Sequence, residues 1–286
     1  METRELRYFV AVAEELHFGR AAERLGIAQP PLSRMISQFE QRLGYALLER
    51  TSRKVRLTEA GSVLLAEGRA ILGALAAAER HARQAAANQP ALVLATKSGV
   101  SSEALAKLLE AYAAEPDAVA VDLLLCDARP QQAVHDGRAD VVLLHQPYDS
   151  TAGLDTETLS TESQVAVLPS THPLAGHARL RTADVSSLPD LPMARWPGPD
   201  GAYPDGPGAE VHNLTQLFQL IALGRTTVIL VESCRPHLPE GLTAVPVLDA
   251  PPVTTQIGWP PHSRSRPLAD LIRVATRLLQ PLPEKR

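Results

Sequence analysis

Polar and basic side chains between positions 20 and 58 have the types and the spacing that suit contact with nucleic acid. Pro30 and Pro31 can open a helix there, because the N–H groups of a first helical turn have no partner within the helix. The apolar stripe that this helix would bury consists of Leu32, Met35 or Ile36, Phe39 and Leu43. Polar groups then remain on the outer face near the helix N-terminus, where a recognition helix presents its base-reading side chains. The candidates on this face are Gln29, Ser33, Arg34 and Ser37.

A basic turn follows this helix and has the composition of a phosphate-binding wing. Residues 48–57 predict two short strands joined by a turn that carries Arg50, Arg53 and Lys54. These residues and Arg20 belong to a segment, residues 20–58, with eight basic and three acidic residues, although the whole chain carries a net charge of −4. Local positive charge in an acidic protein indicates a nucleic-acid surface. The alternative is a small helical domain whose arginines are simply hydrated.

Two short helices precede these candidates and complete a helix-turn-helix pattern. The second of them, Gly19 to Leu25, should stop at Gly26, where glycine adopts the left-handed conformation of a C-terminal cap. Glu5 of the first helix should face water. The expected buried stripe of that first helix is Leu6, Phe9, Val10, Ala13 and Leu16.

Residues 58–87 predict one long helix, because they are rich in alanine and leucine and contain no proline. Two such helices would dimerise through a seam of small and apolar residues; the alternative is a helix packed on its own domain. The hinge after this helix is Asn88-Gln89-Pro90. The seam positions, alternately four and three residues apart, are Leu64, Gly68, Ile71, Leu75, Ala78 and Ala82.

After the hinge, apolar runs alternate with helical patterns, which predicts crossovers over a largely parallel sheet. Ligands in open α/β sheets bind beyond the carboxyl ends of the strands. This rule selects Thr96, Ser98 and Ser101 after the first strand, Asp127 after the second and His145 after the third. Around the Pro/Gly-rich loop at 197–208, the residues that could close over a ligand are Arg195, Trp196 and Tyr203. Each of these polar residues has an alternative role as a helix cap or a surface group.

Length and composition suit an ordinary globular protein of two or three domains, since the chain has 286 residues of which 45% are hydrophobic. The first residues lack the pattern of an export signal, and no uninterrupted apolar run reaches membrane-spanning length, so we expect a cytoplasmic protein without a membrane partner. Cys126 and Cys234 are the two cysteines, and both are expected to be reduced there. A redox-responsive regulator that uses either cysteine is an alternative.

The chain resembles the LysR-type transcriptional regulators. The matching segments of the N-terminal part are 21–25, 29–34, 39–40, 43–44 and 57–61, and looser matches follow at 172–175, 221–224 and Trp259. The resemblance implies an α+β or α/β protein with a winged helix-turn-helix at 1–58, a linker dimerisation helix at 59–88 and an effector-binding domain at 89–286. That domain would have two α/β lobes like those of periplasmic binding proteins. The first lobe would cover about 91–163 and 254–286, and the second about 164–253.

The same resemblance implies DNA contacts from Gln29, Pro30, Ser33 and Arg34, and from the basic wing residues. Its expected partners are promoter double-stranded DNA, a small-molecule effector in place of any cofactor, RNA polymerase, and further copies of the chain in a homodimer or homotetramer.

The sequence departs from the family pattern at four positions. Leu48 stands where phenylalanine is usual, and Thr226, which we include among the effector-binding candidates, stands where glycine is frequent. Asp127 replaces a common Ser or Thr, and His145 replaces a frequent arginine. Both changes remove groups that help to bind a carboxylate, so we expect a neutral, cationic or hydroxyl-bearing effector.

Two other function classes fit the sequence less well. A hydrolase would need a nucleophile elbow, but Lys97-Ser98-Gly99-Val100-Ser101 lacks the Gly-x-Ser-x-Gly spacing, and no metal-ligand cluster is apparent. A solute-binding transport protein would share the two-lobed cleft, but it would need an export signal and no basic winged segment. We therefore expect a regulator and no catalytic residues.

Overall fold

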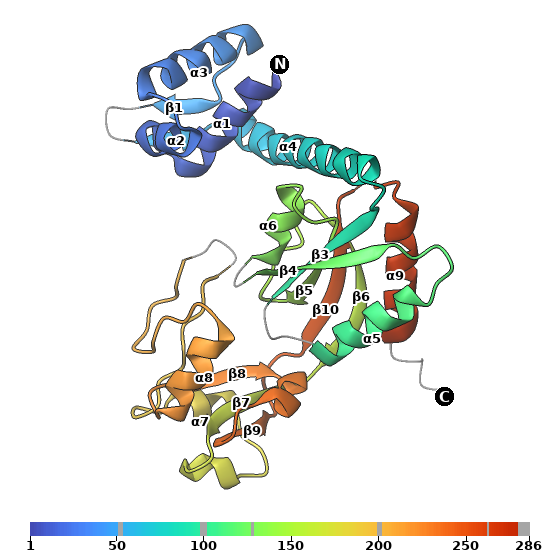
Figure 1. Ribbon diagram of the computed structural model, residues 1–286. Helices are drawn as coiled ribbons and strands as arrows, with labels where there is room; N and C mark the ends of the chain where they lie inside the picture. Colours follow the sequence, from blue (N-terminus) through green and yellow to red (C-terminus); the bar gives the residue numbers. More distant parts are fainter. Residues whose placement is uncertain (51–53, 98–101, 127–128, 199–201, 262, 280–286) are drawn as a thin grey trace. The chain divides into compact units, whose positions relative to one another are not determined.

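A computed structural model describes residues 1–286 except 51–53, 98–101, 127–128, 199–201, 262 and 280–286 (Figure 1). The chain forms two compact units. The first comprises Met1–Ala87 with the short segment His135–Arg138, and the second comprises Asn88–Val134 and Ala139–Arg286. Each unit has its own hydrophobic core.

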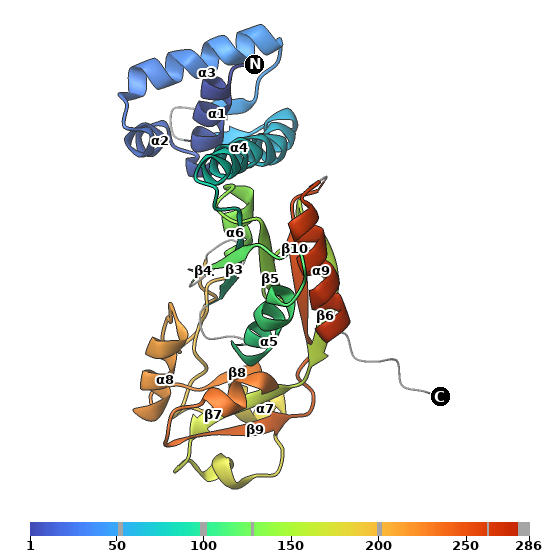
Figure 2. The same cartoon turned by 45° about the vertical axis from the view of Figure 1, so that its right-hand side comes forward.

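The first unit begins with three helices and a two-stranded wing. The elements are α1 (Thr3–Glu15), α2 (Phe18–Leu25), α3 (Gln29–Leu43), β1 (Leu48–Arg50) and β2 (Val55–Leu57). Strands β1 and β2 pair antiparallel. The predicted stripe of α3 is buried through Leu32, Ile36 and Phe39, and the rings of Phe9 and Phe39 meet edge to face at 6.4 Å. Helices α1, α2 and α3 pack together (Figure 2). This core fixes which face of α3 remains outside.

The ends of the short helices follow from local chemistry, with two corrections to the sequence expectations. His17 caps α2 by accepting the N–H groups of Gly19 and Arg20 through Nδ1, and Gly26 ends it with a positive φ of 66°. Leu16, predicted to be buried, lies past the end of α1 with φ 47° and is 44% exposed. Glu5, predicted to face water, is 7% exposed, because it closes the N-terminus of α1 and forms an ion pair with Arg42.

Helix α4 (Glu59–Ala86) is the predicted long helix. Thr58 caps its N-terminus by accepting the Gly61 N–H at 2.9 Å. Only the first two positions of the expected seam pack inside the unit: Gly68 is buried against Leu6 and Leu64 is partly buried, whereas Ile71 is 47% exposed. By length and composition α4 is apolar enough to cross a membrane, a feature that we did not expect, with 17% of its most apolar stretch buried.

The first lobe of the second unit is built on a five-stranded sheet in the order β4-β3-β5-β10-β6, counted over the described residues. Strand β3 is parallel to β4 and β5, whereas β10 is antiparallel to β5 and β6. The strands are β3 (Ala91–Lys97), β4 (Ala120–Cys126), β5 (Val141–Gln146), β6 (Asp155–Glu162) and β10 (Val253–Trp259). The helices of this lobe are α5 (Ser102–Ala113), α6 (Pro130–His135) and α9 (Arg266–Leu279).

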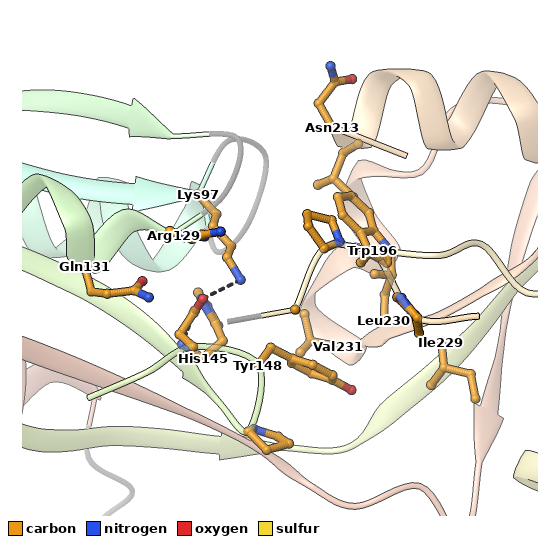
Figure 3. A pocket seen from close by; sticks show the side chains of 16 residues that line it. Lys97, Arg129, Gln131, His145, Tyr148, Trp196, Asn213, Ile229, Leu230 and Val231 are labelled. Atoms are coloured by element: carbon orange, nitrogen blue, oxygen red, sulfur yellow. Dashed lines mark hydrogen bonds and ion pairs between the residues drawn. The ribbon is translucent and has the colours of Figure 1, made fainter. Parts of the chain in front are cut away.

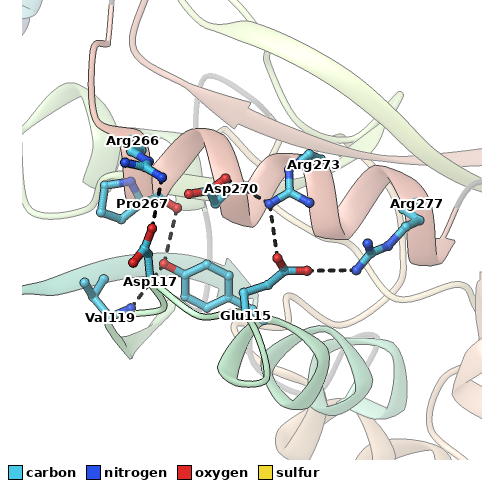
Figure 4. A network of polar contacts seen from close by, with 9 residues as sticks. Glu115, Asp117, Val119, Arg266, Pro267, Asp270, Arg273 and Arg277 are labelled. Atoms are coloured by element: carbon cyan, nitrogen blue, oxygen red, sulfur yellow. Dashed lines mark hydrogen bonds and ion pairs between the residues drawn. The ribbon is translucent and has the colours of Figure 1, made fainter.

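Helices α5 and α9 lie side by side and are joined by polar contacts (Figure 4). Glu115, just after α5, accepts one bond from Arg273 at 3.2 Å and another from Arg277 at 3.0 Å. Beneath them the buried Tyr112 hydroxyl donates to the Pro267 carbonyl at 3.3 Å. Helix α9 is therefore fixed to α5 and the residues just after it, which lie much earlier in the chain.

The parallel pairing that the sequence predicts for the strands before residue 145 is found among β3, β4 and β5, whereas the second lobe has an antiparallel sheet. Among the described residues it has three strands in the order β8-β7-β9, and both pairings are antiparallel. Its elements are β7 (Gln164–Pro169), η1 (Pro173–Gly176), α7 (Thr182–Ser186), α8 (Leu214–Ala222), β8 (Val228–Val231), η2 (Glu232–His237) and β9 (Leu242–Val247). The chain passes from the first sheet to the second after β6, and it returns in β10.

Candidate DNA-binding surface and effector cavity

The outer face of α3 carries the predicted base-reading residues. Gln29 and Pro30 occupy the exposed first turn, and Arg34 lies one turn further on, with its Nε 3.5 Å from the Pro30 carbonyl. Ser33 and Ser37 are partly exposed. The side chain of Arg34 is thus loosely held, and it can reorient toward a base edge or a phosphate at small cost.

Arg50, predicted to contact DNA from the wing, also has a structural role. Its guanidinium donates to Ser37 at 3.1 Å and to Glu40 at 2.6 Å, and it lies over the Phe18 ring at 4.9 Å from the centroid. The other carboxylate oxygen of Glu40 accepts the N–H groups of Leu47 and Leu48. Glu40 therefore positions the wing relative to α3, an assignment that the sequence analysis did not make.

The structure describes two of the three remaining basic candidates. Arg20 is exposed at the start of α2 and bonds to the side chain and the carbonyl of Glu15. Lys54 is exposed before β2. Arg53 lies outside the described residues.

A cavity of about 400 Å³, called here the first cavity, lies in the second unit with one polar wall and one apolar wall. Figure 3 shows side chains of the first lobe on one side and Trp196 with three residues of β8 on the other. The polar wall includes Lys97, Arg129, Gln131, His145, Tyr148 and Asp149. The apolar wall includes Trp196, Pro197, Leu214, Ile229, Leu230 and Val231.

Asp149 organises the polar wall. Its carboxylate accepts the Lys97 ammonium at 2.7 Å and the His145 backbone N–H at 2.8 Å, and its Oδ2 lies 3.8 Å from His145 Nδ1. Burial raises the pKa of the Asp149 carboxyl, but the adjacent His145 ring, the Lys97 charge and the backbone bond outweigh it and hold the pKa below the usual aspartate range. The carboxylate is ionised at neutral pH, and the ion pair is present before any ligand binds.

Three atoms of this wall are buried with no hydrogen-bond partner among the residues that the structure describes. They are Gln131 Oε1 and the two ring nitrogens of His145. Buried polar groups in folded proteins almost always have partners, so each such atom in a cavity is a candidate ligand contact. Gln131 Oε1 accepts hydrogen bonds only, which calls for a donor on the ligand.

Two of the predicted effector-binding residues, His145 and Trp196, line the first cavity. Four described candidates lie elsewhere, and three of them have side chains that form hydrogen bonds inside the fold. Thr226 is fully buried and donates to the Pro192 carbonyl, while Arg195 holds its loop through Gly208, Pro204 and Glu210. Tyr203 bonds to His212, and Thr96 is buried with its hydroxyl unpaired among the described residues. Ser98, Ser101 and Asp127 lie outside the described residues.

The sequence analysis missed most of the polar wall. Lys97 stands next to the selected Thr96, and strand alternation places neighbouring side chains on opposite faces, so a one-residue shift would have found it. Asp149 follows β5 by three residues and carried no motif of its own. Arg129 and Gln131 flank the start of α6, where a helix N-terminus is a weak signal.

The two cysteines lie in separate cores, and no disulfide joins them. Burial raises the pKa of the Cys234 thiol to about 11, which keeps it protonated and unreactive. Cys126 ends β4 at an intermediate depth. Because they belong to different cores, the two cysteines are not positioned to form a disulfide with each other.

Comparison with known protein families decides the identity of both units. Residues 3–62 match the model described as "Bacterial regulatory helix-turn-helix protein, lysR family", and residues 85–280 match the "LysR substrate binding domain". The chain belongs to the LysR family. It is a DNA-binding transcriptional regulator with an effector-binding domain, and its relatives are regulators rather than enzymes.

Individual LysR relatives align over different lengths. The uncharacterized regulator YnfL of Escherichia coli is 33% identical over 96% of this chain and 97% of its own. The regulator AlsR of Bacillus subtilis is 37% identical over 69% of this chain and 66% of its own. The regulator IlvR of Caulobacter vibrioides is 30% identical over 96% of this chain and 98% of its own.

Solved structures share the fold of this LysR chain. The oxidized form of Corynebacterium glutamicum OxyR has a TM-score of 0.53 at 24% identity, covering 97% of this chain and 91% of that one. CbnR in complex with its target DNA has a TM-score of 0.53 at 22% identity, covering 98% of this chain and all of the other. At these identities the likeness concerns architecture, so the assignment of site residues depends on the geometry above.

Proposed function

We propose that the outer face of α3 reads promoter DNA and that the first cavity binds the effector that controls it. The observation that carries the proposal is that the two kinds of candidate binding group lie in different units. The exposed Gln29 and Arg34 and the partly exposed Ser33 lie near the α3 N-terminus, whereas the unpaired buried atoms of the first cavity lie in the second unit.

For DNA binding, Arg34 provides the sharpest test. Replacement of Arg34 with Ala removes base or phosphate contacts worth about 1–3 kcal/mol, which corresponds to a loss of affinity between about fivefold and about 150-fold. Fluorescence anisotropy with a promoter fragment and with random duplex at one salt concentration measures the loss. Arg179→Ala, an exposed change in the second lobe, is the matched control and should leave affinity unchanged. Equal losses in the two variants would contradict the proposal.

For the effector, the two walls favour a ligand with an apolar body and one polar end. Lys97 and Arg129 offer donors to an acidic group, and Gln131 Oε1 requires a donor on the ligand. A hydroxy acid with a branched apolar body combines both features. This retains the hydroxyl expected from the sequence, but it adds the carboxylate that the sequence analysis disfavoured, because Lys97 and Arg129 supply positive charge.

Titration with hydroxyisocaproate and isocaproate, followed by Trp196 fluorescence, tests this ligand class. The hydroxy acid should bind more tightly to the unmodified protein, by about fivefold for one added hydrogen bond. Gln131→Leu should abolish that preference while leaving isocaproate binding in place. An unchanged preference would show that Gln131 does not contact the hydroxyl group. If neither acid binds, the proposal that the effector is a carboxylic acid is wrong.

Several further features remain proposals for this chain. We infer that α4 joins two copies in a homodimer or homotetramer, because Ile71 and Leu75 are exposed near its middle. Leu75→Glu should then convert the protein to monomers in sedimentation experiments, with a loss of DNA affinity because two linked modules bind more tightly than one. Contact with RNA polymerase, a cytoplasmic location and the lack of a cofactor are the corresponding expectations for a regulator of this family.

The proposed mechanism couples the two units through the lobes of the effector-binding domain. A ligand that contacts both walls of the first cavity favours the arrangement of lobes in which both contacts form. DNA affinity then changes only if that arrangement also binds DNA differently. Loss of coupling without loss of DNA binding is the expected effect of changes in the cavity.

A further inference from the structure

A second cavity, of about 630 Å³, lies in the effector-binding unit and shares no lining residue with the first. It is lined by residues of α5, β5, β6, β10 and α9 from the first lobe, and by three residues of η2 from the second. Buried leucines supply its apolar surface, namely Leu105, Leu108, Leu143 and Leu159. Its volume falls in the range of small-molecule sites.

Two hydroxyl groups in this lining are buried without a hydrogen-bond partner in the described part of the chain. Thr255 is 5% exposed and its Oγ1 is unpaired, and Ser233 Oγ is unpaired as well. Thr255 shares its face of β10 with Val253 and Ile257, which belong to the apolar interior. Valine has the same shape as threonine, so a cavity for a purely apolar ligand could have valine at position 255 without loss of packing. The unpaired hydroxyls instead suit a polar occupant.

Charge makes the second cavity differ from the first. Two carboxylates, those of Glu103 and Glu162, line it with one ammonium group, that of Lys107. Lys107 pairs with Glu103 at 2.6 Å, and Glu162 Oε2 accepts the Ser233 backbone N–H at 2.9 Å. The formal charge of these three groups together is negative. A cation is therefore favoured over an anion here.

We propose that the second cavity is a binding site for a small aliphatic amine. Its carbon chain lies against the four leucines, and its ammonium group donates to Thr255, Ser233 and the carboxylate of Glu162. An ammonium group carries three donors and no acceptor, which matches two hydroxyl oxygens and a carboxylate. Removing the carbon chain from water provides the remaining affinity.

The position of the site gives it a regulatory consequence. Ser233, Pro236 and His237 belong to the second lobe, whereas the other lining residues belong to the first. An amine that touches both sets binds more tightly to one arrangement of the lobes. This consequence rests on the function proposed for the first cavity: an effector there also contacts both lobes, and each ligand then changes the affinity for the other by the same factor.

Calorimetric titration of the full chain with hexylamine, hexanol and hexanoate at about pH 8, where a free histidine is neutral, tests the site. Hexylamine should bind saturably and most tightly, and hexanoate most weakly. Glu162→Gln should weaken hexylamine by about tenfold and hexanol much less, because a charge-assisted hydrogen bond is lost only for the amine. Glu110→Gln, an exposed change on α5 outside the lining, is the matched control and should have no effect.

Thr255→Val keeps the shape of the cavity wall and should weaken both hexylamine and hexanol by about fivefold. Melting curves and DNA affinity show whether this variant is folded; if it is not, Ser233→Ala provides the same test. The proposal is wrong if hexylamine shows no saturable binding, or if Thr255→Val and Ser233→Ala both leave its affinity unchanged. It is also wrong if Gln131→Leu in the first cavity, rather than these changes, removes hexylamine binding.

Discussion

Two groups of ion pairs in the effector-binding unit have similar geometry and different surroundings. In the first cavity Lys97 lies 2.7 Å from Asp149, which is 4% exposed. On the α9 surface Arg273 and Arg277 lie 3.2 and 3.0 Å from Glu115, with the arginine side chains 52% and 63% exposed (Figure 4). Because the dielectric environment decides what such a contact is worth, burial should separate the two groups far more than distance does.

The largest expected effect follows from breaking the buried pair. Asp149→Asn leaves the Lys97 ammonium beside a neutral amide in a mostly buried site. This should reduce the free energy of unfolding by about 2–3 kcal/mol. The loss is smaller than for a completely buried pair, because the Lys97 side chain is still partly in contact with water. Urea unfolding measures the change. Asp149→Asn combined with Lys97→Met should recover part of the loss. If the double variant is less stable than the single one, the two side chains do not act as a pair.

The same carboxylate should leave a signature in the pH dependence of stability. The pKa of Asp149 is lowered in the folded chain, so its contribution is complete above the unfolded aspartate value, near 3.9, and it is lost as the pH falls through the folded pKa. Lys97, His145 and Arg129 line the same wall and shape this titration. The acid limb of the stability curve should therefore be shallower in Asp149→Asn than in the unmodified protein. Identical slopes would show that Asp149 keeps an ordinary pKa.

The next effect concerns a buried thiol. The pKa of Cys234 is raised to about 11 from 9.0, which lowers the thiolate fraction near neutral pH by about a hundredfold. Iodoacetamide should label Cys126 in the native protein and reach Cys234 at a rate slower by a comparable factor. A Cys126→Ser variant isolates the slow reaction. Rapid labelling of Cys234 in that variant would contradict its assignment as an inert core residue and would favour the redox alternative.

A smaller effect is expected for the buried hydroxyl under α9. Tyr112 is 1% exposed, and its hydroxyl donates to Pro267 at 3.3 Å and accepts the Val119 N–H at 3.4 Å. Tyr112→Phe keeps the packing and removes both bonds, at a cost of about 1 kcal/mol. Thermal unfolding checks this value, with Tyr45→Phe at an exposed position of the first unit as control. A loss no larger than that of the control would show that these long bonds contribute nothing.

The sequence predicted the first unit well because its determinants are local. Pro30, Gly26 and Gly44 mark helix ends, and the stripe through Leu32, Ile36 and Phe39 defines which face of α3 is buried. Errors arose where a tertiary partner overrides periodicity. Glu5 is buried because Arg42, far along the chain, pairs with it, and no local pattern contains that information.

The second unit was predicted less completely because its elements meet across long separations. Strand β6 was missed since Leu159 is its one fully buried side chain, so it lacks an apolar run. Strand β9 contains Pro246, which argues against a strand by sequence alone. The polar wall of the first cavity joins Lys97 at the end of β3, Gln131 in α6 and Asp149 after β5, and only the folded sheet brings them together.

The smallest expected effect belongs to the exposed group on α9. The hydrogen bonds from Arg273 and Arg277 lower the pKa of Glu115, but all three side chains are in contact with water, and dissolved salt screens their attraction. Glu115→Gln should therefore shift the melting temperature slightly at low salt and not measurably at physiological salt, whereas the loss in Asp149→Asn should persist at both. A salt-independent loss in Glu115→Gln of the size expected for Asp149→Asn would mean that burial is not what separates the two groups.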